Sequence, residues 1–141
     1  MKKKRCWRAR RLAGALLLAA SWVSACRSDP ESTRGVAERF LDAHYVSIDL
    51  RAAETLAAGI AREKIGKERS LVGEQGIDES TRKPTVHYRF VEERPDDEGR
   101  SRLIYRATFS VADAESLDRR ILLVLRREPE GWKVVNFEEF E

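Results

Sequence analysis

The apolar residues of this chain change their spacing near Thr85, and that change restricts the folds it can adopt. Between residues 35 and 72 apolar side chains recur every three or four positions, which is the period of an amphipathic helix. From Thr85 onward they recur every second position, as in a strand with one covered face. Helices followed by consecutive strands predict an α+β domain, in which N-terminal helices pack on a curved four-stranded antiparallel sheet.

The helical half divides at Asp49, whose side-chain oxygen is suited to capping a helix that begins at Leu50. A first helix is predicted over residues 35–48. Two glycines weaken the second helix, so residues 61–72 are either its continuation or a third short helix. Residues 73–83 contain two more glycines and precede a proline, which predicts a loop.

Four strands are predicted in the second half of the chain. The first places Val86, Tyr88 and Phe90 on one face. The third is apolar on both faces for most of its length, as expected of a strand that is covered on two sides. Polar turns rich in acidic residues, proline and glycine separate neighbouring strands. The four strands cover residues 85–91, 102–111, 121–127 and 132–137.

The first 25 residues have the three parts of a secretory signal. Residues 1–11 hold seven bases and no acid, residues 12–23 are nearly all apolar, and small residues lead into Cys26. A bilayer-spanning helix needs roughly 20 apolar residues. Because this run is shorter, a cleaved signal is predicted in preference to a permanent transmembrane helix.

The end of this signal is the sequence Val23-Ser24-Ala25-Cys26. It resembles the lipobox of bacterial lipoproteins, which is an aliphatic residue, two small residues and a cysteine. The resemblance implies that a signal peptidase recognises Val23, Ser24 and Ala25 and cleaves before Cys26, whose sulfur is acylated. Two or more acyl chains hold a protein firmly to a bilayer. An ordinary secretory signal, with Cys26 as a plain mature cysteine, is the alternative.

The resemblance also bears on where the protein resides. Arg27 stands where, in well-studied enteric bacteria, an aspartate favours retention in the inner membrane, so Arg27 favours the outer membrane. The predicted location is the bacterial cell envelope, on a membrane and facing the periplasm. Residues 1–25 are then a signal peptide, residues 26–33 a lipidated tether of at most ~25 Å, and residues 34–141 a single α+β domain.

Most of the positive charge belongs to the signal. The chain has 27 Lys+Arg and 24 Asp+Glu, and seven of the bases lie in residues 1–25. The remainder has 20 bases and 24 acids, so its net charge is −4. Nucleic-acid binding, which needs a clustered basic surface, loses its overall support, and so does electrostatic adhesion to an anionic leaflet. Of the two cysteines, Cys6 leaves with the signal and Cys26 carries lipid, so no disulfide is expected.

Two short motifs in the domain recur in one known fold. Phe40-Leu41-Asp42-Ala43, followed by Asp49 and Ala52-Ala53, and later Gly131-Trp132-Lys133-Val134, resemble small bacterial lipoproteins with a nuclear transport factor 2-like (cystatin-like) domain. The resemblance spans most of residues 34–140. It implies a curved sheet wrapped around the long helix, leaving a conical cavity. It implies no reaction, because such folds host both enzymes and pure binding modules.

Groups suited to acid–base chemistry in that cavity are His44, Asp42, His87, Tyr88 and Tyr105. His44 and Asp42 are two apart on a helix and do not face each other. His87 lies on the strand face opposite the apolar one, so both histidines are expected at the surface or its boundary. Two histidines without an available cysteine form no metal-ligand pattern. Phosphate-binding glycine motifs and the Gly-x-Ser-x-Gly elbow are missing, and no cofactor or metal is predicted.

Alternating aromatic residues are the candidates for lining a ligand pocket: Tyr88, Phe90, Tyr105 and Phe109, together with His87. The same pattern is also typical of an ordinary core, and this alternative stays open. The predicted function is a membrane-anchored, non-enzymatic envelope module that binds a small apolar ligand or a neighbouring envelope protein, and no nucleic acid. The alternatives are an isomerase- or dehydratase-type enzyme and a homodimeric structural subunit paired through the open sheet face.

Overall fold

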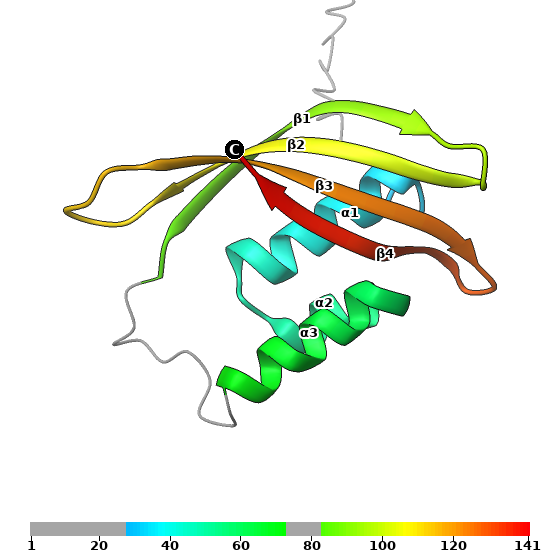
Figure 1. The fold of residues 1–141 in the computed structure, drawn as a ribbon, viewed down its shortest axis with the longest axis horizontal. Helices are drawn as coiled ribbons and strands as arrows, with labels where there is room; N and C mark the ends of the chain where they lie inside the picture. Colours follow the sequence, from blue (N-terminus) through cyan, green and yellow to red (C-terminus); the bar gives the residue numbers. More distant parts are fainter. Residues whose placement is uncertain (1–27, 73–82) are drawn as a thin grey trace, which may run out of the picture.

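The change of apolar spacing at Thr85 becomes a change from helix to strand in the structure, a computed structural model that describes residues 28–72 and 83–141 (Figure 1). The predicted signal peptide and lipobox, with Val23, Ser24, Ala25 and Cys26, lie outside the described residues. So does most of the predicted loop over residues 73–83. The elements are α1 (Thr33–Leu41), the π-helix η1 (Asp42–Val46), α2 (Leu50–Thr55), α3 (Gly59–Val72), β1 (Thr85–Pro95), β2 (Arg100–Ser110), β3 (Leu117–Glu128) and β4 (Gly131–Phe140).

The first predicted helix is present, but its second half is a π-helix. The Ser32 side chain caps α1 by accepting a hydrogen bond from the Gly35 N–H, and the chain continues from α1 into η1. In η1 each turn takes in an extra residue, so the Ser47 N–H donates to the Asp42 carbonyl five residues back, at 2.8 Å. Short π-helical turns are rare and are frequently found at functional sites.

The second predicted helix is divided into α2 and α3. Asp49 caps α2 as predicted, by accepting a backbone hydrogen bond of 2.9 Å. Between the two helices the chain pairs with β4: the Ala58 N–H donates to the Val134 carbonyl at 2.9 Å, and the Val134 N–H donates to the Leu56 carbonyl at 3.0 Å. Gly59 then opens α3 with a φ of 53°, a left-handed conformation that favours glycine. Residues 61–72 therefore belong to a third helix.

The strands form one antiparallel sheet in the order β1-β2-β3-β4, which confirms the predicted α+β class with a four-stranded antiparallel sheet. All three α-helices lie on the same side of the sheet (Figure 1). α1 packs on the inner face, and the core forms between them. The largest fully buried side chains are Phe40, Leu41, Ile65, Leu103, Tyr105, Ile121, Leu123, Leu125 and Val134.

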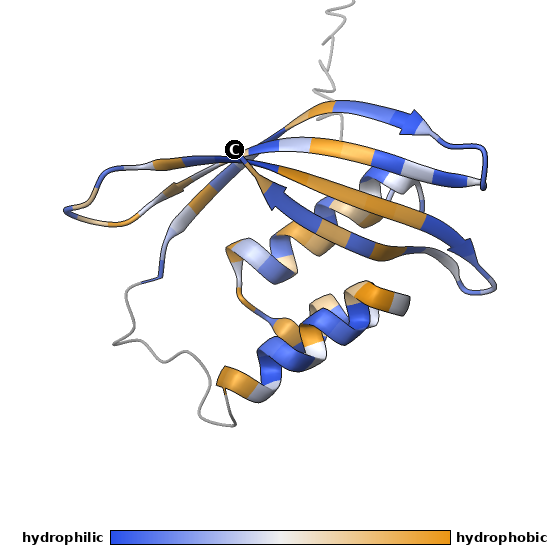
Figure 2. Ribbon diagram, in the orientation of Figure 1, coloured by the Kyte–Doolittle hydropathy of each residue, from blue (hydrophilic) through white to orange (hydrophobic). Residues whose placement is uncertain are grey.

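The outer face of the sheet is open within the described residues. The middle of β3 is strongly hydrophobic (Figure 2), and it was expected to be covered on both sides. Its inner residues are fully buried, whereas Leu122 and Val124 on the outer side remain half-exposed. The structure therefore covers β3 on one side only, because every helix packs on the inner face.

Residues 28–32, which belong to the predicted tether, pack against α1. The Arg39 guanidinium donates to the Pro30 carbonyl at 3.0 Å. A Cβ atom at Gly35 would lie 2.0 Å from the Asp29 carbonyl oxygen, so only glycine permits this close approach. The segment just before α1 is thus part of the domain surface and does not extend away from it.

Candidate functional site

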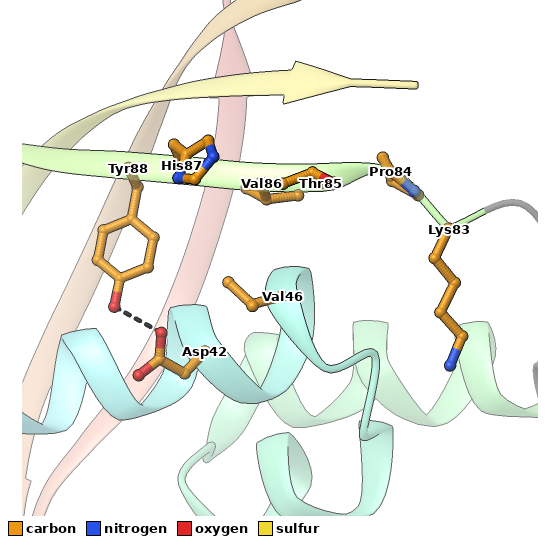
Figure 3. A pocket seen from close by; sticks show the side chains of 8 residues that line it. All are labelled: Asp42, Val46, Lys83, Pro84, Thr85, Val86, His87 and Tyr88. Carbon is orange, nitrogen blue, oxygen red and sulfur yellow. Dashed lines mark hydrogen bonds between the residues drawn. The ribbon is translucent and has the colours of Figure 1, made fainter. Parts of the chain in front are cut away.

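A cleft of about 580 Å³ opens between η1 and the beginning of β1, and we call it the mouth cleft. Pro84 precedes β1, where the chain leaves the loop and joins the sheet edge. Val46 at the end of η1 and Val86 on the inner side of β1 supply apolar walls (Figure 3). Eight residues line the cleft: Asp42, Val46, Lys83, Pro84, Thr85, Val86, His87 and Tyr88.

A tyrosine and a carboxylate meet in the mouth cleft. The Tyr88 hydroxyl donates to Oδ1 of Asp42 at 2.7 Å (Figure 3). Burial, and then this hydrogen bond, raise the pKa of Tyr88 above its ordinary value of 10.0. Tyr88 therefore stays protonated and acts as a donor at neutral pH. The carboxyl group of Asp42 belongs to an exposed residue, so its remaining lone pairs are accessible for a ligand that donates hydrogen bonds.

Of the five predicted pocket residues, Tyr88 points into the mouth cleft, whereas His87 borders it from β1 with its side chain on the opposite, outer side of the strand (Figure 3). Tyr105 is fully buried in the core, where the rings of Tyr88 and Phe90 meet it edge-on at 5.8 and 5.7 Å. Phe109 packs edge-on against a buried tyrosine of η1 at 6.0 Å. The structure thus places three of the five in aromatic packing, next to the cleft residue Tyr88 but outside the cleft itself.

A second polar contact joins η1 to α3. His44 Nε2 lies 2.6 Å from Oε2 of Glu68, and the His44 side chain is only 10% exposed. Phe40 stacks on its ring at 5.5 Å, and Phe137 lies 4.9 Å away. The mouth cleft does not include this pair. Aromatic rings enclose the imidazole, and its contact with Glu68 joins α3 to η1.

The His44–Glu68 contact could not be found from the sequence. The two residues are 24 positions apart on different helices, and only the packing of α3 brings them together. The two predicted catalytic candidates on η1 point to different neighbours, Asp42 to Tyr88 and His44 to Glu68. This agrees with the prediction that Asp42 and His44 do not face each other.

Within residues 28–72 and 83–141, no three histidine, cysteine, aspartate or glutamate side chains come close enough together to hold a metal ion. Among the helices that the structure describes, none has the length and apolar character needed to cross a bilayer.

Similarity to solved structures shows that the helices and the four-stranded sheet form a nuclear transport factor 2-like, cystatin-like fold. No protein-family model matches the chain, and no curated protein matches it. A calcium/calmodulin-dependent protein kinase type II association domain from Thiobacillus denitrificans is similar in structure, with a TM-score of 0.58, 15% identity, and coverage of 77% of this chain and 93% of that one.

Two other solved structures give the same result. A cystatin-like domain of unknown function from Nostoc punctiforme has a TM-score of 0.56 at 11% identity, covering 75% of this chain and 72% of that one. A ketosteroid isomerase-like protein from Erwinia carotovora atroseptica has a TM-score of 0.53 at 13% identity, covering 80% and 96%. At these identities the likeness concerns the fold alone, because this fold hosts many activities.

Proposed function

We propose that this chain is a lipid-anchored protein of the bacterial cell envelope, whose α+β domain is a non-enzymatic binding module. The basic start, the apolar run and the Val23-Ser24-Ala25-Cys26 sequence support the anchor. Ser28 is two residues beyond Cys26, a separation of at most ~7 Å, and residues 28–32 pack against α1. An acylated Cys26 then holds the domain directly at the bilayer, facing the periplasm. Arg27 favours the outer membrane.

The mouth cleft is the proposed ligand site. The observation that carries this proposal is that two valines and the hydrogen-bonded pair of Tyr88 and Asp42 line one cleft of about 580 Å³. Apolar walls with a few convergent polar groups are typical of small-molecule sites. A fitting ligand is small, with an apolar body against Val46 and Val86 and a hydrogen-bond donor that reaches Asp42.

Filling the cleft tests the ligand site. In the Val46→Trp variant an indole replaces a side chain that is 41% exposed and lines the cleft. Val91→Trp is the matched control, because Val91 is 53% exposed on β1 and is not a cleft residue. Mass spectrometry of protein extracted gently from its native membrane should show a small molecule bound to the unaltered chain and to Val91→Trp but not to Val46→Trp. Equal retention in both variants, or no bound molecule at all, refutes the site.

The anchor is tested separately. Cys26→Ser removes the only sulfur that a lipobox would acylate, so the chain should leave the membrane fraction or remain unprocessed. Its mass should also lack the acyl groups carried by the unaltered chain. If mass and fractionation are the same for both proteins, the chain is not a lipoprotein.

The hydrogen bond between Tyr88 and Asp42 favours one alternative, an isomerase- or dehydratase-type enzyme that uses the same cleft. A carboxylate and a protonated tyrosine in one cleft are the groups that abstract a proton and stabilise the resulting oxyanion. Incubating the co-purified molecule with the protein in D2O distinguishes the two functions. Deuterium incorporation that is lost in Asp42→Asn supports catalysis, and its absence supports a binding module.

A further inference from the structure

Three arginines form a straight row across the open face of the sheet. Arg89 of β1 lies opposite Arg106 of β2, and Arg106 lies opposite Arg120 of β3. Directly opposed residues of antiparallel strands project from the same face. With strands about 4.8 Å apart, the row spans about 10 Å. All three residues are exposed, and we call Arg89, Arg106 and Arg120 the arginine row.

Among the described residues, no ion pair includes a member of the arginine row. Three carboxylates flank the row on the same face, and none of them pairs with it. Glu92, opposite Ile104, pairs with Arg94 at 2.8 Å, Asp118 accepts a hydrogen bond from Thr108 at 2.6 Å, and Glu138 accepts one from Asn136 at 3.0 Å. The row is therefore a local concentration of positive charge on a domain whose overall charge is negative.

A second row of cations on the sheet makes this arrangement distinctive. Arg100 lies opposite Arg126, and Arg126 lies opposite Lys133; we call these three the paired row. Each member has its own partner: Asp96 at 2.8 Å for Arg100, Glu128 at 2.8 Å for Arg126 and the Thr55 carbonyl at 2.7 Å for Lys133. The chain thus supplies partners for one cation row and leaves the other without them.

Like charges placed directly opposite each other destabilise a sheet, so an external anion would stabilise the arginine row. Guanidinium groups bind phosphate in a bidentate geometry and are weakly hydrated. Two residues along β2 and β3 from Arg106 and Arg120, the opposed pair Ile104 and Leu122 is on the same face and is half-exposed. Basic and apolar side chains side by side on one surface are suited to the boundary between lipid headgroups and acyl chains.

We propose that the arginine row binds the phosphate groups of anionic lipids and lays the open sheet face against the bilayer. This inference rests on the proposed lipid anchor, which brings the face to the membrane. The Thr33 hydroxyl, at the start of α1, donates to Glu93 of β1 at 2.7 Å. Glu93 is on the inner side of β1, an edge strand of the sheet, and about 13 Å along the strand from Arg89. A chain anchored just before Ser28 is therefore attached near the β1 edge, from which the open face can reach the membrane.

Two other occupants fit less well. A second copy of this chain, paired face to face about a two-fold axis, would bring two unneutralised arginine rows together, and like-charge contacts oppose such pairing. An acidic segment of another protein has suitable charge. However, a short membrane anchor keeps lipid phosphate at high effective concentration, whereas a separate protein must diffuse to the face.

Vesicle partitioning tests the proposal. The full chain carrying Cys26→Ser, which has no acyl group, is mixed with vesicles of phosphatidylcholine alone or with added phosphatidylglycerol. The N-terminal segment is identical in all variants and binds vesicles by itself, so the test is the difference between the two triple variants. One triple variant changes the arginine row (Arg89→Gln, Arg106→Gln, Arg120→Gln). The matched control changes the paired row (Arg100→Gln, Arg126→Gln, Lys133→Gln) and loses the same three charges.

The preference for anionic vesicles should fall about fivefold per arginine removed from the arginine row, or on the order of 100-fold for the triple variant. The control should keep most of that preference. Added salt should weaken the preference of the unaltered chain and of the control. Circular dichroism verifies folding, and the single variant Arg106→Gln, with an expected loss of about fivefold, replaces any triple variant that unfolds.

Three results overturn the proposal. The first is that the unaltered chain shows no preference for anionic vesicles, and the second is that both triple variants lose this preference equally. The third is that the unaltered chain sediments as a dimer and the arginine-row variant as a monomer, while vesicle binding is the same for both. Binding to soluble polyglutamate without a preference for anionic vesicles assigns the face to an acidic protein instead. Because the assayed chain has no acyl group, failure here leaves the anchor intact, and failure of the anchor does not alter the vesicle result.

Discussion

The two faces of the sheet are made from alternate residues of the same strands, yet they have opposite energetic roles. On the inner face Tyr105 and Leu123 are fully buried beneath α1. On the outer face their chain neighbours Arg106 and Leu122 remain exposed or half-exposed. The inner face therefore supplies the stability of the domain, whereas the outer face leaves charge and apolar area free for contact. Substitutions on the two faces should therefore change the free energy of unfolding by different amounts, and in one case with opposite sign.

The largest effect is expected where the inner face meets α1. Phe40 is fully buried there, so Phe40→Ala should lower the free energy of unfolding by about 2–5 kcal/mol, through lost burial and a residual cavity. Val91→Ala, at an outer position that is 53% exposed, should change it by less than about 0.5 kcal/mol. Urea unfolding of both variants measures the difference. Similar midpoints would mean that α1 does not fill the inner face.

The tyrosines of the inner face predict a loss of stability at alkaline pH. Burial raises the pKa of Tyr105 above its ordinary value of 10.0, and burial likewise raises the pKa of Tyr88. Below pH 10 both the folded and the unfolded chain keep these protons, so stability is unaffected. Above pH 10 the unfolded chain releases protons that the folded chain retains, and stability falls by about 1.4 kcal/mol per pH unit for the fully buried Tyr105. The loss is smaller for Tyr88, which is only half-buried and is screened by solvent.

Tyr105→Phe isolates one of these contributions. At pH 11 the variant should escape about 1.4 kcal/mol of the loss measured between pH 9 and pH 11 for the unaltered chain, since lysine titration affects both proteins alike. At neutral pH it should be as stable or more stable, because the Tyr105 hydroxyl is buried without a hydrogen-bond partner among the described residues. Parallel alkaline profiles for the two proteins would contradict the assignment.

Much of this two-faced arrangement was predictable from residue spacing. The alternation of Val86, Tyr88 and Phe90 correctly predicted the inner face of β1, and the side chain of Asp49 correctly predicted the start of α2. Spacing did not predict the bulge between Phe90 and Glu92. A bulge adds one unpaired residue to a strand and reverses its later faces, and no residue type in β1 specifies its position.

The candidate site was predictable only in part, because its contacts join distant parts of the chain. Tyr88 and His87 were candidates from their place on the first strand, and of these Tyr88 points into the mouth cleft while the His87 side chain lies on the other side of β1 (Figure 3). The partner of Tyr88 is Asp42, 46 positions earlier, and its approach depends on how η1 docks on the sheet. The π-helical form of η1 could not be predicted from the sequence either, because apolar residues spaced three and four apart do not indicate an extra residue per turn.

A smaller effect is expected for the hydrogen bond at the edge of the inner face. Tyr88→Phe removes the donor to Asp42 and should cost about 0.5–1.5 kcal/mol of stability. Thr108→Val on the outer face removes a hydrogen bond of similar length, 2.6 Å to Asp118. Both acceptors, Asp42 and Asp118, are exposed, but the Tyr88 hydroxyl also contacts the half-buried Glu38 carbonyl at 3.3 Å. The change at Thr108 should therefore be smaller. Thermal melts of both variants make the comparison, and an equal loss would remove the distinction between the faces.

The smallest expected effect has the opposite sign and comes from the arginine row. Arg106 faces an arginine on each side, so Arg106→Thr should stabilise the domain by about 0.2–1 kcal/mol at low salt. Arg126→Thr, at the centre of the paired row, removes a cation bonded to Glu128 at 2.8 Å and should be neutral or destabilising. Added salt should shrink the gain from Arg106→Thr, because these charges are exposed. A stability gain that is equal in both variants, or that persists at high salt, would show that strand propensity causes it. A gain confined to Arg106→Thr at low salt means that the outer face keeps an unfavourable charge arrangement that an external anion can relieve.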